Sequence, residues 1–219
     1  MSSLWSIGKL FRFEATRQLD GRDDGHSFTA EVVLAAESLD DVGFVVDFGR
    51  LKPLKHHIRD VFDHRLLNGR VPDVSDEGLA ASLTEWSREH LPDDVTAALV
   101  EVRIRTGRAP APTDGFTVGF EATHYLSGLP AGHQCGQRHG HSYLVTAADA
   151  YGRPTPVPQD LSWHIEEVLN GAVLNETVPF NPTSERLAEH LMTWLDRYPA
   201  AIRVSETETS WAQYTRRTL

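Results

Sequence analysis

The chain has 219 residues, and its 21 basic against 31 acidic residues give a formal net charge of −10. That charge argues against non-specific binding to nucleic acid or to an anionic membrane. Apolar residues make up 40% of the chain, enough for a packed core, and no apolar run is long enough to span a bilayer. The single cysteine, Cys135, excludes an intrachain disulfide, so we expect a protein of the reducing cytoplasm.

Five segments of the first half carry a secondary-structure signal. Residues 10–15 and 27–36 alternate or run apolar, as strands do. Apolar residues at helical spacing, among them Leu51, Leu54 and Ile58, predict a helix over 51–62. A second helix is predicted over 75–91, with Ser75 as a candidate N-cap. A strand over 98–104 closes the set. The predicted order is therefore strand, strand, helix, helix, strand.

The second half repeats this order, with strands at 116–123, 142–148 and 202–207 and helices at 158–169 and 184–198. Short motifs repeat in the same order too: Phe-Glu-Ala-Thr at 13–16 and 120–123, Leu-Asn at 67–68 and 174–175, and Val-Pro at 71–72 and 178–179. We therefore predict two homologous modules, 1–108 and 116–219, joined by a Pro- and Gly-rich linker at 109–115.

Three histidines of the second module form a candidate metal site. His139 and His141 are two residues apart, so on a strand they share a face. His124 lies on the preceding predicted strand, and an antiparallel hairpin would bring it across from that pair. Three imidazoles with an open position are the ligand set of a catalytic zinc. From spacing alone, the alternative of two surface histidines and one partly buried one stays open.

Cys135 lies four residues before His139. A thiol beside a metal or cations has a lowered pKa and becomes a nucleophile or base. The alternative is a small buried hydrophobic residue, the commoner fate of a lone cysteine.

Together, several motifs resemble the 6-pyruvoyl-tetrahydropterin synthase / 6-carboxy-tetrahydropterin synthase family, once per module. They are residues 120–126, Cys135 with 139–141, 181–185, and 204–207 with Tyr214 in the second module, and 46–49, 63–65 and 67–68 in the first. The resemblance implies an α+β protein built from two tandem tunnelling-fold modules. Each would be a four-stranded antiparallel sheet with two helices, and the modules would assemble into a barrel.

The resemblance also implies roles for single residues. His124, His139 and His141 would bind Zn²⁺, and Cys135 would be the catalytic thiolate. The Cys-x-x-x-His-Gly-His spacing looks like the 6-carboxy type, which feeds deazapurine and queuosine synthesis.

Glu206 would anchor the pterin, with Thr207 and Thr183 lining the same pocket, and Asp63 and His64 would form an Asp-His dyad opposite the thiolate. Without the resemblance, Glu206 would be a solvated charge at a strand end and Asp63-His64 a polar pair at a helix end.

Each module departs from the family pattern in a different half of the site. The first module has Arg17, Asp24 and His26 at the ligand positions and Arg105 at the apparent anchor position. The second has residues 170–172, Asn-Gly-Ala, where the first has its dyad. In the family, the dyad and the zinc group that act together come from different subunits. We therefore expect one complete composite site to survive in the fused chain.

The resemblance implies a zinc-dependent carbon–oxygen lyase that acts on 7,8-dihydroneopterin triphosphate with loss of triphosphate, of the 6-carboxy-tetrahydropterin synthase type. The alternatives are 6-pyruvoyl-tetrahydropterin synthase activity and a non-catalytic zinc- or pterin-binding remnant. Arg65, Lys52 and Lys55 are candidates for the triphosphate by charge alone. Six modules would complete two stacked barrels, so we expect a homotrimer, with a dimer or tetramer as the rival.

Overall fold

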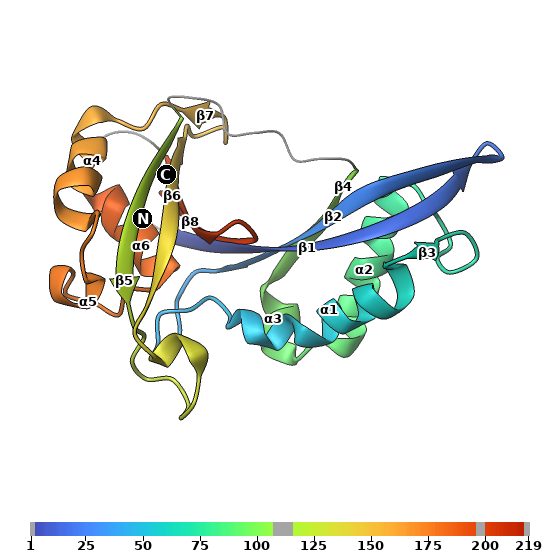
Figure 1. Cartoon of the computed structure of the whole chain (residues 1–219), viewed down its shortest axis with the longest axis horizontal. Coiled ribbons are helices and arrows are strands. Elements are labelled where there is room, and N and C mark those ends of the chain that lie inside the picture. The colour runs from blue at the N-terminus through green and yellow to red at the C-terminus, as the bar shows by residue number, and fades with distance from the viewer. Residues whose placement is uncertain (1–2, 107–115, 196–199, 217–219) are drawn as a thin grey trace. The chain divides into compact units, whose positions relative to one another are not determined.

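The computed structural model of the chain describes residues 3–106, 116–195 and 200–216 (Figure 1). The linker expected at 109–115 lies outside the described residues. Two compact units are present. One, here called the second-module unit, contains residues 1–7, 35–45 and 112–219, and the other, the first-module unit, contains residues 8–34 and 46–111. No helix in the described part of the chain is long and apolar enough to cross a membrane.

The second-module unit has a sheet in the order β9-β8-β6-β5, with every neighbouring pair antiparallel. Its long strands are β5 (Thr117–His124), β6 (His139–Ala148), β8 (Ala201–Thr207) and β9 (Ser210–Arg216), and the short β7 (Pro154–Thr155) pairs with β6. This is the four-stranded antiparallel sheet that the resemblance implies. The sequence patterns predicted three of these strands and missed β9.

Helices cover one face of this sheet (Figure 1). They are α4 (Gln159–His164), which runs into the π-helical turn η4 (Ile165–Leu169), then α5 (Leu174–Thr177) and α6 (Ser184–Thr193). Alternate strand residues such as Phe120, Val145 and Val204 point into this layer and pack with Leu161 and Leu187. The period of two in the strands and the helical spacing of leucines therefore build one core.

The first-module unit has counterparts of β8, β6 and β5 but, among its described residues, none of β9. Its three long strands run in the order β4-β2-β1, and the short β3 is parallel to β1. The strands are β1 (Ser3–Leu19), whose first residues belong to the second-module unit, β2 (Arg22–Ala36), β3 (Arg65–Leu66) and β4 (Leu99–Thr106).

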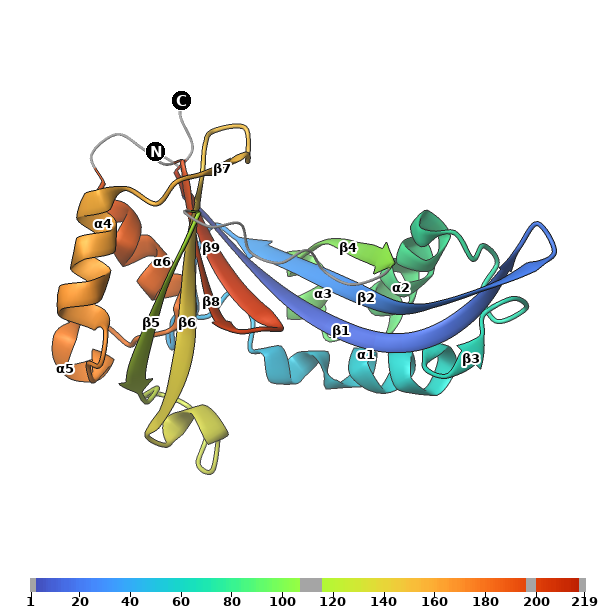
Figure 2. The ribbon, with the colours of Figure 1, turned by 45° about the horizontal axis from the view of Figure 1, so that its top comes forward.

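The helical segments of the first-module unit are η1 (Phe48–Leu51), α1 (Lys52–His57), η2 (Ile58–Phe62), α2 (Asp76–His90) and α3 (Asp93–Ala98), and Figure 2 shows α1 and α2 beside β1 and β2. The core includes Phe13, stacked on Phe28 at 5.2 Å between ring centroids and edge-on to Phe62. The predicted N-cap Ser75 accepts the backbone N–H of Gly78, which fixes the start of α2.

A buried histidine in the second-module unit makes stability depend on pH. His164 is 4% exposed and stacks on Trp194, and neither of its ring nitrogens has a hydrogen-bond partner among the described residues. Burial, with the nearby His190, lowers the pKa of His164 below its usual value near 6.5. The unfolded chain therefore binds the proton more readily. Stability from this group is complete above about pH 6.5 and falls as the pH drops below it.

We expect His164→Phe to flatten the fall in urea midpoint between pH 7.5 and pH 5.5, because the ring stack is kept and the titrating group is removed. His56→Gln, at an exposed position on α1, is the control and should leave the pH slope unchanged. Equal pH slopes in the His164→Phe variant and the unaltered protein would contradict the prediction.

Candidate metal and active site

The three predicted metal ligands come together at one end of the β5–β6 hairpin. The register places His124 opposite His139, and His141 lies two residues farther along β6 on the same face. Glu206, at the end of β8, joins them. Each of the four residues offers one donor atom, and all four atoms lie within 4.8 Å of one another. The sequence predicted the three histidines as one group but not the closeness of Glu206.

Backbone carbonyls fix the tautomers of two of these rings. Nδ1 of His124 is 3.0 Å from the carbonyl oxygen of Pro182, and Nδ1 of His139 is 2.6 Å from that of Gln137. A carbonyl can only accept, so both Nδ1 atoms carry the proton. The two Nε2 lone pairs then face each other at 3.1 Å. A cation between them would satisfy both lone pairs, and a carbonyl behind each imidazole is the usual support of a metal ligand.

Glu206 adds a negative charge to the cluster. Its Oε1 lies 2.9 Å from Nε2 of His141 and 3.3 Å from Nε2 of His124. Burial alone would raise the pKa of Glu206, but the contacts with His124 and His141 outweigh it, and the pKa is lowered. Three imidazole nitrogens with a carboxylate oxygen suit a divalent ion such as Zn²⁺, so the residues present fit a metal.

The two threonines expected to line the pocket use their hydroxyls locally. Thr183 caps α6 by accepting the N–H of Arg186, and it donates to the carbonyl of Gly43 at 2.9 Å. The hydroxyl of Thr207 is 2.6 Å from that of Ser210 and helps close the β8–β9 turn. Their contact with a pterin stays a prediction.

Cys135 lies in the short 3-10 turn η3 (Gln134–Gly136) between β5 and β6, where it is half-buried. Its carbonyl accepts the N–H of Leu126, and its own N–H donates to Nδ1 of His133 at 3.2 Å. Burial, together with negative charge on Glu206 and Cys135, raises the pKa of Tyr143. Sequence reasoning missed His133, whose signal was a histidine two residues before the cysteine.

The predicted dyad forms in the first-module unit. Nδ1 of His64 lies 3.0 Å from Oδ1 of Asp63, and the same oxygen accepts the backbone N–H of Glu14. The backbone contact is the main cause that lowers the pKa of Asp63. His64 has a positive φ of 55°, and its side chain is 74% exposed. The dyad is thus held at its carboxylate and open at its imidazole.

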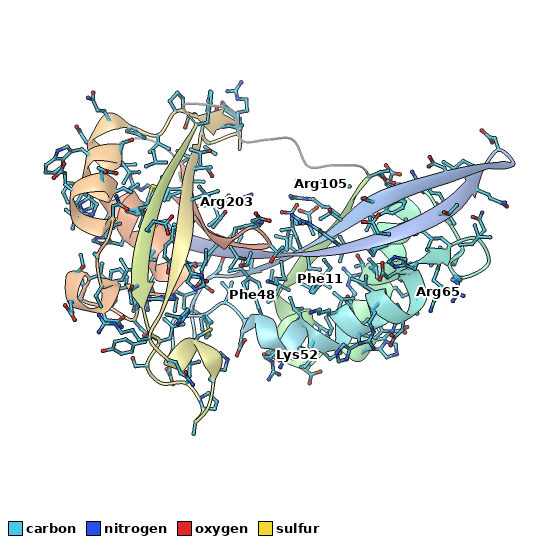
Figure 3. All side chains as sticks on the ribbon, viewed as in Figure 1. Phe11, Phe48, Lys52, Arg65, Arg105 and Arg203 are labelled. Atoms are coloured by element: carbon cyan, nitrogen blue, oxygen red, sulfur yellow. The ribbon has the colours of Figure 1, made fainter. Side chains whose placement is uncertain are left out.

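A pocket of about 730 Å³ lies beside the dyad, lined among others by Ser27, His64 and Arg65. Arg65 lies on β3 and Lys52 at the start of α1, as Figure 3 shows. Lys52, Lys55 and Arg65 are all exposed. Of these three basic candidates for the triphosphate, Arg65 lines this pocket.

The second module keeps the backbone frame of the dyad without its chemistry. Oδ1 of Asn170 accepts the N–H of Glu121, and Gly171 has a φ of 73°. These are the contact made by Asp63 and the backbone conformation of His64. The amide replaces the carboxylate, and glycine offers no imidazole, so this position has no proton-transfer group.

The first module replaces the metal ligands with an ion pair. Nε of Arg17 lies 2.9 Å from Oδ2 of Asp24. These two residues are the counterparts of His124 and His139, whose imidazoles face each other in the second module. Arg17 also donates to the carbonyl of Val74, the residue before the α2 N-cap, as His124 contacts Pro182 before α6. A permanent cation therefore fills the place that a metal would take.

The apparent match of Glu206 to Arg105 is wrong. In the first module, Thr106 on β4 lies opposite Phe28 on β2. In the second module, Ser205 on β8 lies opposite Leu144, the residue after Tyr143, which is the counterpart of Phe28. The residue after Ser205, Glu206, therefore corresponds to Thr106. The hydroxyl of Thr106 donates to Asp76, the first residue of α2, as Ser184, the first residue of α6, donates to Glu206. The sequence match failed because the spacing between modules changes before these strands. Arg105 instead pairs with buried Glu31.

Residues 42–45 form a strap within the second-module unit. Nδ2 of Asn181 donates to the carbonyl of Val42 at 2.7 Å, and Thr183 donates to the next carbonyl along, that of Gly43. The N–H of Val45 donates to Oε1 of Glu185 at 3.2 Å. Glu185 is buried, and burial raises its pKa to about 7. The Asn-Pro-Thr-Ser-Glu motif thus holds a segment from the first half of the chain.

Comparisons with known proteins place this arrangement in a family. The model of the family described as 6-pyruvoyl tetrahydropterin synthase matches residues 6–109 and again residues 116–217. A 6-carboxy-5,6,7,8-tetrahydropterin synthase of Bacillus subtilis is 36% identical over 78 residues, which is 36% of this chain and 51% of that protein. A dihydroneopterin monophosphate aldolase of Pyrococcus furiosus is 37% identical over 71 residues, 32% of this chain and 60% of that protein.

The matched regions span about half the length of these curated relatives. Among solved structures, 6-pyruvoyl tetrahydropterin synthase of Caenorhabditis elegans aligns with a TM-score of 0.40 and 18% identity, over 48% of this chain and 96% of that chain.

Proposed function

The chain belongs to the 6-pyruvoyl tetrahydropterin synthase family, twice over, and from that premise we propose that it is a zinc-dependent lyase of the 6-carboxy-tetrahydropterin synthase type. Its substrate is 7,8-dihydroneopterin triphosphate, which with one water gives triphosphate, acetaldehyde from two of its three side-chain carbons, and the 6-carboxy-tetrahydropterin. The observation that carries the proposal is the cluster of His124, His139 and His141, with two tautomers fixed so that their Nε2 lone pairs converge.

Each group of the chain has one task in this reaction. The three histidines hold Zn²⁺, which when bound polarises the side-chain oxygens of the substrate. The Cys135 thiolate accepts one proton from the substrate, and His64, oriented by Asp63, transfers a second proton as triphosphate leaves. Glu206 accepts the paired N–H donors of the pterin edge, with Thr183 and Thr207 beside it.

The dyad and the thiolate act together in one composite site. Support comes from what each module has lost: Arg17 and Asp24 replace the metal in the first module, and Asn170 and Gly171 replace the dyad in the second. Neither module has a full set, yet the two together have one. We propose that the site forms between modules, in a homo-oligomer that buries the sheet edges, with a trimer favoured over a dimer or tetramer. A cytoplasmic location suits the thiolate.

Incubation of the purified, zinc-loaded protein with dihydroneopterin triphosphate tests the proposal. We expect release of triphosphate and acetaldehyde with a 6-carboxy-tetrahydropterin product, identified by mass spectrometry. A 6-pyruvoyl product would favour the first alternative. A parallel assay with dihydroneopterin monophosphate tests the activity named for the Pyrococcus furiosus relative. Tight zinc or pterin binding with no turnover of either substrate would leave the non-catalytic reading.

A further inference from the structure

The carboxylate of Glu206 sits where the fourth ligand of a tetrahedral metal would sit. A zinc ion with bonds of about 2.0–2.1 Å places its donor atoms about 3.3 Å apart along each tetrahedral edge. The separations here are 3.1 Å between Nε2 of His124 and of His139, 3.3 Å between Nε2 of His124 and Oε1 of Glu206, and 2.9 Å between Nε2 of His141 and the same oxygen. These three spacings are close to the tetrahedral value, and all four donor atoms lie within 4.8 Å of one another.

The direction of the Glu206 contact also favours a shared metal over a hydrogen bond. Oε1 of Glu206 is only 2.9 Å from Nε2 of His141, yet that nitrogen is buried and has no partner of hydrogen-bond geometry among the described residues. Two donor atoms that are close without pointing at each other are typical of ligands that converge on a metal. A neutral His124 with its proton on Nδ1 likewise cannot donate from Nε2 to the carboxylate.

The second oxygen of Glu206 is held separately. Oε2 accepts the hydroxyl of Ser184, the first residue of α6, at 3.2 Å. The carboxylate is therefore oriented with one oxygen toward the helix and the other toward the three imidazoles. In this state Glu206 is not free to accept the two parallel N–H donors of a pterin edge.

We infer that Glu206 is the fourth metal ligand of the substrate-free protein, and that pterin binding removes it from the metal. The exchange step rests on the proposed function, in which Glu206 accepts the pterin edge. Before substrate arrives, the site is closed with three nitrogens and one oxygen, as in a structural zinc site. Pterin binding takes the carboxylate away and opens one coordination position to the side-chain oxygens of the same substrate. By linkage, metal and pterin ring then compete for Glu206.

Metal affinity tests the ligand claim without any pterin. The metal-free full-length protein is titrated with zinc against a chromophoric chelator, and with Co²⁺, whose visible bands report coordination. Removal of the carboxylate should weaken zinc binding at least as much as loss of a supporting residue, so Glu206→Gln is expected to cost about 10- to 100-fold and to shift the Co²⁺ bands. Glu208→Gln, which removes an exposed carboxylate from the same β8–β9 turn, is the matched control.

Circular dichroism of the metal-free variants guards against misfolding, and the three histidines should keep binding at one zinc per chain in Glu206→Gln. A zinc affinity within about twofold of the unaltered protein, with unchanged Co²⁺ bands, would overturn the ligand claim, since loss of a true ligand costs more.

A pterin without side-chain oxygens tests the exchange. We expect 6-methylpterin to shift the Co²⁺ bands of the unaltered protein toward those of Glu206→Gln, and to bind the metal-free protein more tightly than the zinc-loaded one. Calorimetric binding of 6-methylpterin that leaves the bands unmoved would overturn the exchange. If 6-methylpterin does not bind at all, the pterin substrate of the proposed function fails, while the zinc titration still decides the ligand claim.

Discussion

His139→Ala is expected to lose the bound metal and the activity together. The Nε2 atoms of His139 and His124 converge at 3.1 Å, and the remaining two imidazoles would no longer enclose the ion. Elemental analysis of the gently purified protein should give one zinc per chain and, for the variant, none. Activity should fall to background in the same preparation.

The control is His26→Ala, which removes the histidine that corresponds in the first module to His141. Its module has the Arg17–Asp24 ion pair in the place of the metal, so zinc content should be unchanged. Two zinc ions per chain in the unaltered protein, or a loss of zinc from His26→Ala, would show that the first module also binds metal.

His64→Ala and Cys135→Ala are each expected to lower turnover by about 10²–10⁴-fold while zinc stays bound, as for loss of a general acid–base group. Because the dyad and the thiolate act on one substrate, the double variant should lose much less than the product of the two single losses. The measurement is turnover with zinc content determined on the same samples. Losses that multiply would indicate two independent functions.

Asp63→Asn separates the chemistry of the dyad from its structural contact. Asn170 of the second module shows that an amide oxygen holds the equivalent backbone N–H, so the variant should fold normally. We expect lower turnover with an unchanged urea midpoint, because the charge that orients His64 is gone. A large loss of stability with full specific activity would assign Asp63 a structural role only.

Mixing two inactive variants tests where the dyad meets the thiolate. Co-assembled His64→Ala and Cys135→Ala chains should recover part of the activity if one chain supplies the dyad and another the metal and thiolate. Co-assembly that restores nothing, with mixed oligomers verified by mass, would instead place both halves of the site in a single chain.

Local patterns identified the elements whose signal lies within a few residues. The helical spacing of Leu51, Leu54 and Ile58, the Ser75 cap and the alternation in β6 all reappear in the structure. The strand β9 escaped because the residues before it, Glu208-Thr209, contain none of the glycine or asparagine that marks a tight hairpin. It forms because its aromatic residues Trp211 and Tyr214 find partners, Arg203 on β8 and Trp5 on β1.

The sequence by itself determined the duplicated module, the family and the three histidines, because repeats, motifs and a His-x-His pair on a strand are properties of order along the chain. Only the tertiary structure decided what surrounds them. Pro182 and Glu206 are far in sequence from the β5–β6 hairpin that holds the three histidines, and Thr106 is far from the matching hairpin of the first module. Strand register, and not spacing along the chain, brings each of them beside its hairpin. The ion pair that stands in place of a metal site in the first module also depends on tertiary structure. Arg17 meets Asp24 across a hairpin and Asp76 at a helix start, a convergence that depends on packing of strands against a helix.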